Sequence, residues 1–420
     1  MSAVNNKNFA IRALLASIFA AFAATGFLLS LIPRRRSMIC FIGHLGHYNG
    51  NAKFLFEACQ THLGINYFRA EGVQCLFVNH KGATPTDVPP DFEILNVNTV
   101  WDSWRYLSAL WRSKILVITT PGYDWKLRHL LAWRANTLLL SNGTPLKSPG
   151  SISKHFTAIK TKKYLSFWRD INQVWVSSTM ERYMVSSSLQ IPIERVIVNG
   201  AARQIIFTEE ALHEQKPRAC KKLEQLLGER VVGKRLALVA LTHRDYKADK
   251  RHSALDSISS LAGFEANKFQ DFLQKNNIEL VIRDHVITQS SSVQAFDVDF
   301  TYMDSDLLPE LNDVISAFDI VITDYSGLYL DLLDQKISIG LLRFPEDDFI
   351  VQRGLILPDD FLVAGMAIQS IQELEQLLLE KHSQKTQMLK RRMLHALFFE
   401  LSAKESVAKN ISALQKFIEN

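Results

Sequence analysis

The clearest pattern of apolar and polar positions in this 420-residue chain lies at residues 319–334, which read DIVITDYSGLYLDLLD. The β-branched run Ile320–Ile322 is typical of a strand buried on both faces of a parallel sheet. Small and polar residues then precede leucines at helical spacing, which predicts a strand, a tight turn and a helix. Ser326 would place its hydroxyl at the helix N-terminus, where an anion can bind beyond the carboxyl end of the strand. The alternative is an ordinary turn in which Ser326 only caps the helix.

Similar short apolar runs predict a parallel sheet in each half of the chain, because each run adjoins a helical or loop segment. These runs begin at Met38, Gln74, Ile115, Thr137, Val174, Arg195, Leu236, Glu279 and Ile337. The charged segment Thr208–Arg230 predicts a linker helix that is broken at Pro217. Residues 371–379 and 381–418 predict long amphipathic helices near the end of the chain.

The segment Ala13–Ile32 contains 20 residues without a charge, and as a helix it would be roughly 30 Å long, the thickness of a bilayer core. It ends at Pro33 and the three arginines 34–36. We predict a single-pass anchor in the plasma membrane, with the following domains on the cytoplasmic side because of these arginines. A cleaved signal peptide is the alternative, since residues 21–24 offer small side chains for cleavage.

Composition narrows the function classes. The length and a hydrophobic content of 47% suit two globular domains. The chain carries 48 Lys and Arg against 43 Asp and Glu, and three of the basic residues are clustered at 34–36, so no nucleic-acid-binding stripe is expected. The four cysteines show neither CxxC pairing nor metal-ligand spacing, and there is no acidic cluster, so we predict no metal and no other cofactor.

Glycine-rich and polar loops follow several predicted strands. Residues 43–53, GHLGHYNGNAK, do not fit GxGxxG, so no dinucleotide site is predicted, although their glycines allow close approach of a ligand. Residues 141–150, SNGTPLKSPG, include Thr144 and Lys147, which are candidates for binding a phosphate unless this is a plain loop.

In the second half, Thr242 and Arg244 follow one strand, and His285 follows the next. A Thr and an Arg at the carboxyl end of a strand suit a phosphate. The alternatives are a surface pair between Arg244 and Asp245 and an ordinary polar loop histidine.

The order of these motifs resembles the CDP-glycerol glycerophosphotransferase family of teichoic-acid and capsule polymer synthesis. GHYNGNAK, NGTPLK, NGAARQ, LTHRD, RDH, ITDYSGLYLD and QRG follow one another over most of residues 40–380. The resemblance implies a GT-B fold, with two Rossmann-like domains facing a cleft. Here these would be residues 37–205 and 233–380, with an anchor at 1–36, a linker helix at 206–232 and C-terminal helices at 381–420.

The resemblance also implies an activity. It is the transfer of glycerol phosphate, or another polyol phosphate, from a CDP-activated donor to a lipid-linked or glycan acceptor, with release of CMP and without a required metal. By position, the donor phosphates would be bound in the second domain by Thr242, Arg244, His285, Ser326, Gly327, Asp331 and Arg353. The matching residues of the first domain are Gly46, Asn51, Lys53, Gly143, Pro145, Lys147, Gly200 and Arg203.

One position departs from the family motif His-Gly-x-Pro-Leu-Lys, whose histidine would be the acceptor base. Here it is Asn142, which cannot accept a proton near neutral pH. Either His47 or His44 replaces it, with His47 preferred, or transfer relies on positioning and electrostatics alone. A third alternative is that the protein is a weakened or inactive relative. For the two histidines themselves, the alternative is an ordinary role as hydrogen-bonded loop residues. A nucleotide-sugar glycosyltransferase and a non-catalytic nucleotide-binding protein of a capsule complex are the rival functions.

Overall fold

The computed structural model describes residues 38–419, apart from short gaps. The gaps are 62–64, 81–87, 124, 133, 144, 149, 153–156, 243–253, 284–299, 304–307, 345–348 and 381–384. The anchor predicted at 13–32 therefore lies outside the described residues, as do Thr144, Arg244 and His285. Among the helices that are described, none combines the length and the apolar composition needed to cross a bilayer.

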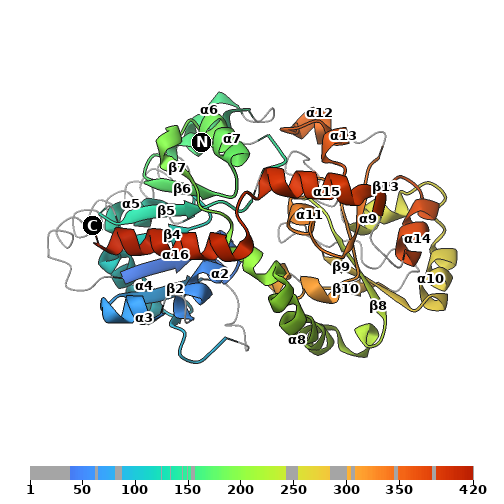
Figure 1. The fold of residues 1–420 in the computed structure, drawn as a ribbon, viewed down its shortest axis with the longest axis horizontal. Helices are drawn as coiled ribbons and strands as arrows, with labels where there is room; N and C mark the ends of the chain where they lie inside the picture. The colour runs from blue at the N-terminus through green and yellow to red at the C-terminus, as the bar shows by residue number, and fades with distance from the viewer. Residues whose placement is uncertain are drawn as a thin grey trace, which may run out of the picture.

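The first half forms a seven-stranded parallel sheet in the order β3-β2-β1-β4-β5-β6-β7 (Figure 1). Its strands are β1 Met38–Ile42, β2 Gln74–Asn79, β3 Ile94–Asn96, β4 Ile115–Ile118, β5 Asn136–Leu140, β6 Gln173–Val176 and β7 Val196–Val198. In the central register, Ile39 pairs with Cys75 of β2 and with Ile115 of β4. Six of these strands were predicted from their apolar runs, whereas β3 has only three residues and gives too short a pattern.

The second half forms a six-stranded parallel sheet in the order β10-β9-β8-β11-β12-β13. Its strands are β8 Arg235–Ala240, β9 Ile278–Arg283, β10 Thr301–Tyr302, β11 Ile320–Thr323, β12 Ser338–Leu342 and β13 Met366–Ile368. All four residues of β11 are buried, as predicted for a strand covered on both faces. The α/β class with two parallel sheets is thus confirmed.

The helices surround these sheets. In the first half they are α2 Gly50–Gln60, α3 Ile65–Ala70, α4 Val100–Arg112, α5 Trp125–Leu131, α6 Ala158–Ser166 and α7 Thr179–Leu189. The connecting helix is α8 Glu209–Leu227, and the second half adds α9 Ala254–Ser259, α10 Ala266–Lys275, α11 Leu328–Asp331, α12 Phe349–Arg353, α13 Asp359–Leu362 and α14 Ile371–Leu379. The last helices are α15 Lys385–Phe398 and α16 Ala403–Glu419.

Three predicted helices differ from those observed. Pro217 lies inside α8 and does not end it, because Ala219 and Leu223 beyond it are buried in the core and hold the helix in place. The predicted helix 381–418 is two helices, with α15 beside the second sheet and α16 beside the first (Figure 1).

The helix after Ser326 is also shorter than its leucine spacing predicts, since α11 ends at Asp331. The guanidinium of Arg391 on α15 donates hydrogen bonds to the carbonyls of Leu332 and Leu333, at 2.7 and 2.9 Å. It also donates to the carbonyls of Gln335 and Ile337. A side chain distant in sequence thus satisfies carbonyls that a further helical turn would have used.

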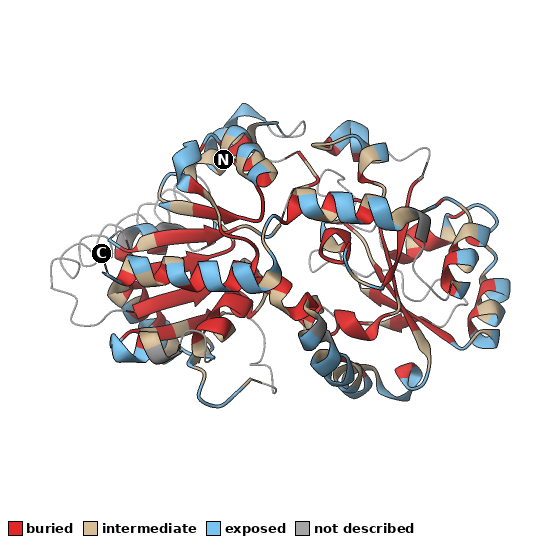
Figure 2. Ribbon diagram, viewed as in Figure 1, coloured by how far each residue is buried: buried red, intermediate tan, exposed pale blue. Residues whose placement is uncertain are grey.

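The two halves share buried apolar surface. Figure 2 shows the strands of both sheets as buried and the outer faces of the helices as exposed. One cluster of packed apolar residues contains Ile39 of β1, Val321 of β11 and Leu414 of α16. The C-terminal helix α16 thus follows the second domain in the sequence but packs against the first, and this packing joins the two halves.

Candidate functional site

A polar cluster lies at the carboxyl ends of β1 and β4, where the strand order of the first sheet reverses direction. His44 follows β1 and Thr120 follows β4, and Nδ1 of His44 lies 3.0 Å from Oγ1 of Thr120. The backbone N–H of Leu45 donates to the same threonine oxygen at 3.3 Å. Such a switch point is where open α/β sheets bind their ligands.

Backbone geometry fixes His44 in this position. Leu45 adopts a left-handed conformation with φ of 53°, which is uncommon for a residue with a side chain. A Cβ added at Gly43 would lie 2.1 Å from the carbonyl oxygen of His47, so only glycine fits this turn. The side chain of Asn49 accepts a hydrogen bond from the His44 backbone N–H at 2.7 Å and closes the loop.

Asn142 completes the cluster from the carboxyl end of β5. Its side-chain nitrogen lies 3.2 Å from Nδ1 of His44 and donates to the Thr119 carbonyl at 3.4 Å. Because an amide nitrogen donates, Nδ1 of His44 is the acceptor in this arrangement and its proton is on Nε2. Burial, followed by the nearby His47, lowers the pKa of His44, so the imidazole is neutral at neutral pH.

His47 lies in the same loop and is buried at 6% exposure. The contacts with Asn142 and Thr120 are made by His44. The sequence analysis preferred His47 over His44 as the acceptor base, and the two histidines lie in the same loop after β1.

Buried contacts behind this cluster join α2 to the loops after β5 and β7. Asn51 donates to the Ser141 carbonyl at 2.6 Å and accepts from the Arg203 backbone N–H at 2.9 Å. Gly143 has φ of 108°, and a Cβ there would lie 2.4 Å from an Arg203 guanidinium nitrogen. Asn51 and Gly143 thus shape the loop that carries Asn142.

Arg203 connects the first half to the second. Its guanidinium forms a bidentate ion pair with Asp331 on α11, with both N–O distances at 2.9 Å. Gln204 donates to the same carboxylate at 2.7 Å. Both charged groups are buried, so in this structure these two predicted substrate-binding residues bind each other.

Lys53 makes a second ionic contact between the halves. Its ammonium group pairs with Asp313, which also pairs with Lys222 of α8 at 3.1 Å. Burial acts to lower the pKa of Lys53, but Asp313 and other nearby carboxylates outweigh it, and the pKa is raised. Burial acts to raise the pKa of Asp313, but the two lysines lower it. Both groups are therefore charged over the physiological range.

The loop with Lys147 pairs with the segment after α12. Lys147 and Leu355 form an antiparallel bridge, and the Ser148 backbone N–H donates to the Gly354 carbonyl at 3.1 Å. Arg353 donates to the Ser148 carbonyl at 2.5 Å. Two motifs predicted to bind substrate, one in each half, thus lie side by side.

The second sheet has polar groups at its own switch point, between β8 and β11. The backbone N–H of Thr242 donates to the carboxylate of Asp324 at 2.7 Å. The Thr242 hydroxyl oxygen is buried and has no hydrogen-bond partner among the described residues. Ser326 accepts from the Leu328 backbone N–H at 3.3 Å at the turn into α11, although the N-cap of α11 is the exposed Gly327 and not Ser326.

Four polar residues at these sites were missing from the sequence prediction: Thr120, Glu310, Asp313 and Asp324. Thr120 and Asp324 lie within two positions of the end of a buried strand, which is the signal that identified Thr242. Glu310, which accepts from the Gly50 backbone N–H, and Asp313 gave no such signal because they lie at the two ends of a short 3₁₀ helix before β11 and do not follow a strand.

Two parallel sheets with polar switch points define an α/β protein of GT-B-like architecture. The family model described as CDP-Glycerol:Poly(glycerophosphate) glycerophosphotransferase matches residues 27–414. The chain therefore belongs to this family of transferase enzymes, which confirms the resemblance.

Two relatives, one of them in two solved structures, illustrate the likeness. Teichoic acid ribitol-phosphate polymerase TarL of Staphylococcus aureus (strain NCTC 8325 / PS 47) is 24% identical over 206 residues, which are 49% of this chain and 35% of TarL. The match thus spans about a third of that relative. The structural alignment with wall teichoic acid polymerase TagF includes 100% of this chain and 98% of the TagF chain, at 16% sequence identity and a TM-score of 0.65. The alignment with a histidine-to-asparagine variant of TagF soaked with CDPG includes 100% of this chain and 99% of the variant, at 17% sequence identity and a TM-score of 0.68.

Proposed function

We propose that this protein transfers glycerol phosphate, or ribitol phosphate, from a CDP-activated donor to a lipid-linked or glycan acceptor and releases CMP, in the synthesis of a cell-wall or capsule polymer. The observation that carries the proposal is the cluster of His44, Thr120 and Asn142 at the switch point of a sheet in a member of this family. The cluster places the neutral imidazole of His44 beside Asn142, the residue that replaces the histidine of the family motif in this chain.

In this mechanism an acceptor hydroxyl attacks the β-phosphorus of the donor in line with the bond to the α-phosphate. The new oxygen–phosphorus bond forms, the bond to the bridging oxygen breaks, and CMP leaves with that oxygen. His44 takes the hydroxyl proton, which requires its neutral form. If the Asn142 amide turns its oxygen toward Nδ1, that nitrogen carries the proton and the lone pair of Nε2 is available as the base.

The donor would bind at the switch point of the second sheet. Thr242 offers its buried hydroxyl, and Ser326 and Gly327 offer polar groups at the turn after β11. Arg244 and His285 follow β8 and β9 in sequence and would neutralise the charge that develops on CMP. In the first half, Thr144 and Lys147 belong to the loop that would bind a phosphate, and Arg353 is hydrogen-bonded to that loop.

Five other predicted ligands have a different role in this proposal. Asn51 and Gly143 shape the loop that carries Asn142, and the Arg203–Asp331 and Lys53–Asp313 pairs set the distance between the two halves. Transfer between two bound substrates depends on such positioning.

Product analysis tests the function. The purified full-length protein is incubated with CDP-glycerol, CDP-ribitol and a panel of nucleotide sugars, each with acceptor-containing membrane extract. Release of CMP with labelled polyol phosphate in the acceptor supports the proposal. Release of a nucleoside diphosphate would identify a glycosyltransferase instead, and binding of CDP without turnover would identify a non-catalytic relative, the alternative that Asn142 keeps open.

A further inference from the structure

Helix α6 and the segment after α7 enclose a hollow of about 600 Å³ on the first domain. The described residues that line it include Lys162, Arg169 and Arg195 but no Asp or Glu. None of these three cations makes an ion pair or a side-chain hydrogen bond within the part of the chain that the structure describes. The hollow therefore presents positive charge that is available to an anionic ligand.

The carboxylates that are nearest in the sequence do not reduce this charge by pairing with it. Asp170 follows Arg169, but its carboxylate lies 3.0 Å from Nδ1 of His129. Glu194 precedes Arg195 and is not among the residues that line the hollow. The chain as a whole has 48 Lys and Arg against 43 Asp and Glu, so the surplus at this place is local.

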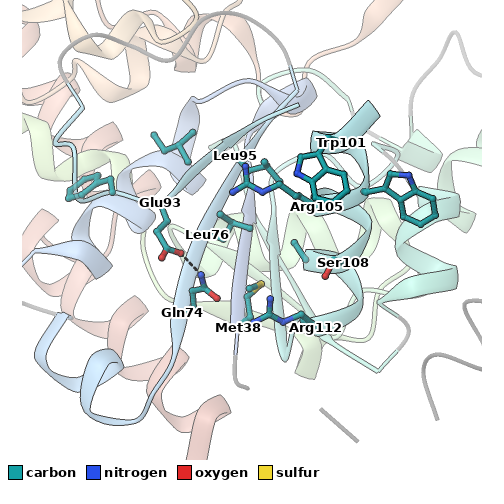
Figure 3. A pocket seen from close by; sticks show the side chains of 13 residues that line it. Met38, Gln74, Leu76, Glu93, Leu95, Trp101, Arg105, Ser108 and Arg112 are labelled. Carbon is teal, nitrogen blue, oxygen red and sulfur yellow. Dashed lines mark hydrogen bonds between the residues drawn. The ribbon is translucent and has the colours of Figure 1, made fainter. Parts of the chain in front are cut away.

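Another hollow of the same domain has a mixed lining. It measures about 540 Å³ and lies between α4 and the edge formed by β2 and β3. Figure 3 shows Glu93 at this hollow, accepting a hydrogen bond from Gln74. Arg105 lines it too and lies 3.9 Å from the Asp102 carboxylate. A polyanion would meet a carboxylate there, so the charge pattern favours the hollow beside α6.

The floor of the hollow beside α6 is apolar and well fixed. Trp168, Leu189 and Ile191 line it and are buried. Gln190 has a left-handed backbone with φ of 54°, and its N–H donates to the Ser186 carbonyl. The Ser186 hydroxyl donates to the Ile191 carbonyl at 2.7 Å. Charges of one sign around an apolar wall focus their field into the hollow, which raises the local concentration of anions.

The hollow is separate from the catalytic cluster. It lies at the amino ends of β6 and β7, because Arg169 precedes β6 and Arg195 precedes β7. The catalytic cluster lies at the opposite edge of the same sheet. Helix α7 starts just after β6, and its last residue, Leu189, lines the hollow. Eleven helical residues span roughly 16 Å, which is the approximate distance between the two places.

The loop after β5 leads from the cleft to this hollow. Ser148 of the loop meets the second half of the chain at Gly354. The Ser151 hydroxyl donates to the Ser188 carbonyl at 2.8 Å, next to Leu189 in the hollow. Three residues of chain span at most roughly 11 Å. A ligand that leaves the cleft along this loop therefore meets the hollow after a short distance.

We propose that this hollow binds the phosphodiester chain of the growing polymer, away from the end that reacts. The inference rests on the proposed function, because the transferase would extend a chain in which every unit carries a negative charge, and the family model is described for poly(glycerophosphate). Lys162, Arg169 and Arg195 would pair with successive phosphates, and the polyol C–H groups would lie on the apolar floor. A chain bound here would stay on the enzyme between additions.

The test measures how the full-length protein binds a lipid-free, fluorescein-labelled poly(glycerol phosphate) fragment, by fluorescence anisotropy. The hollow variant combines Lys162→Gln, Arg169→Gln and Arg195→Gln. All three side chains are exposed, so the variant should melt like wild type. We expect it to bind the fragment about ten- to a hundredfold more weakly, because three exposed ion pairs with phosphate are lost.

A matched control variant removes the same charge elsewhere. It combines Arg218→Gln, Lys221→Gln and Lys275→Gln, which are exposed residues of α8 and α10. The control should bind the fragment like wild type. With CDP-glycerol and an acceptor of a single unit, both variants should release CMP at the wild-type rate. On a membrane acceptor, only the hollow variant should make shorter chains.

Equal weakening in both variants would show that net charge alone attracts the fragment, and unchanged binding in the hollow variant would place the chain elsewhere. Either result overturns the proposal. So does a hollow variant that loses binding to phosphatidylglycerol vesicles but not to the fragment, which would assign the cations to lipid. CMP release without fragment binding would overturn this proposal and leave the proposed function standing. Fragment binding that depends on the hollow, without CMP release, would do the reverse.

Discussion

The side-chain nitrogen of Asn142 lies 3.2 Å from Nδ1 of His44, although 98 positions separate the two residues in the sequence. The contact arises because β1 and β5 flank β4 in one parallel sheet, so their following loops meet at the same edge. The imidazole of His44 therefore lies beside the asparagine that replaces the histidine of the family motif in this chain.

Removal of this base is the first prediction. His44→Ala should lower transfer by about 10²–10⁴-fold with little change in CDP affinity, which is the usual size of a lost general base. His129→Ala is the control, since that histidine is exposed and paired with Asp170. Initial rates with CDP-glycerol and calorimetry with CDP provide the measurements. A wild-type rate in His44→Ala would exclude it as the base, and a loss in His47→Ala instead would restore the preference from sequence.

The pH dependence of the rate provides a second readout of the same residue. The pKa of His44 is lowered from its ordinary 6.5, chiefly by burial. Because the neutral form is the active one, the rate should fall only below pH 6.5, as the imidazole becomes protonated. His44→Ala should abolish this acidic limb of the pH–rate profile. If His44 had only a structural role, the mutant would keep the limb at the same pH.

The Lys53–Asp313 pair should contribute to stability. Lys53→Met leaves a buried carboxylate with only Lys222, and removing one partner of a buried pair typically costs about 3–5 kcal/mol. Because Lys222 remains beside Asp313, we expect Lys53→Met to lower the free energy of unfolding in urea by at least half of this amount. Lys268→Met breaks an exposed pair with Glu265 and should cost almost nothing.

The sign of the pH effect follows from the lowered pKa of Asp313. A carboxylate whose pKa is lower in the folded state stabilises above its unfolded pKa, near 3.8, and loses that contribution as the pH falls through the folded value. The difference between wild type and Lys53→Met should therefore be constant at neutral pH and shrink only in strong acid. A difference that disappears near pH 6 would contradict this assignment.

The donor site gives a prediction that separates two roles of Ser326. If its hydroxyl binds the donor pyrophosphate, Ser326→Ala should weaken CDP binding about ten- to a hundredfold, as should His285→Ala. If it only holds the turn into α11 through its hydrogen bond with Leu328, the mutant should lose about 0.5–1.5 kcal/mol of stability and keep its CDP affinity. Ser402→Ala removes another hydrogen bond from a backbone N–H to a serine hydroxyl, the one from Glu405, and serves as the control.

The apolar segment should be dispensable for chemistry. Because residues 13–32 are uncharged, match the thickness of a bilayer core and end before three arginines, a chain starting at Ser37 should be soluble and still turn over the CDP donor. It should lose transfer to a membrane-embedded acceptor, because recruitment to the bilayer would be weakened. Donor turnover and vesicle sedimentation measure the two effects, and a folded truncation that cannot use the donor would show that the segment does more than anchor.

The sequence predicted well what depends on local pattern. β11 was predicted because four buried positions form a continuous apolar run, and its neighbours were predicted for the same reason. The short length of α11 was not predicted, because it depends on Arg391, about 60 positions later in the chain, which donates to the carbonyl of Leu332 just after the helix. Nor could any local pattern reveal that Lys53 meets Asp313, since 260 positions separate them.

The same limit applies to the candidate base. Both histidines were placed at the correct edge of the sheet because the loop directly follows a strand. Choosing between them depends on the left-handed backbone of Leu45 and on the loop after β4, where Thr120 contacts His44. Neither feature has a sequence signal that separates His44 from His47.

Asn142 itself decides between an active enzyme and an inactive relative. If His44 is the base, Asn142 only orients its ring, and Asn142→Ala should cost less than His44→Ala. Asn142→His restores the residue of the family motif and should leave the transfer rate unchanged or raise it, since it adds a second imidazole that can accept the proton. The rates of the three variants and of wild type with CDP-glycerol and CDP-ribitol measure this. A wild type that is inert with every donor, beside an active Asn142→His, would show that the protein has lost the reaction and retains only binding.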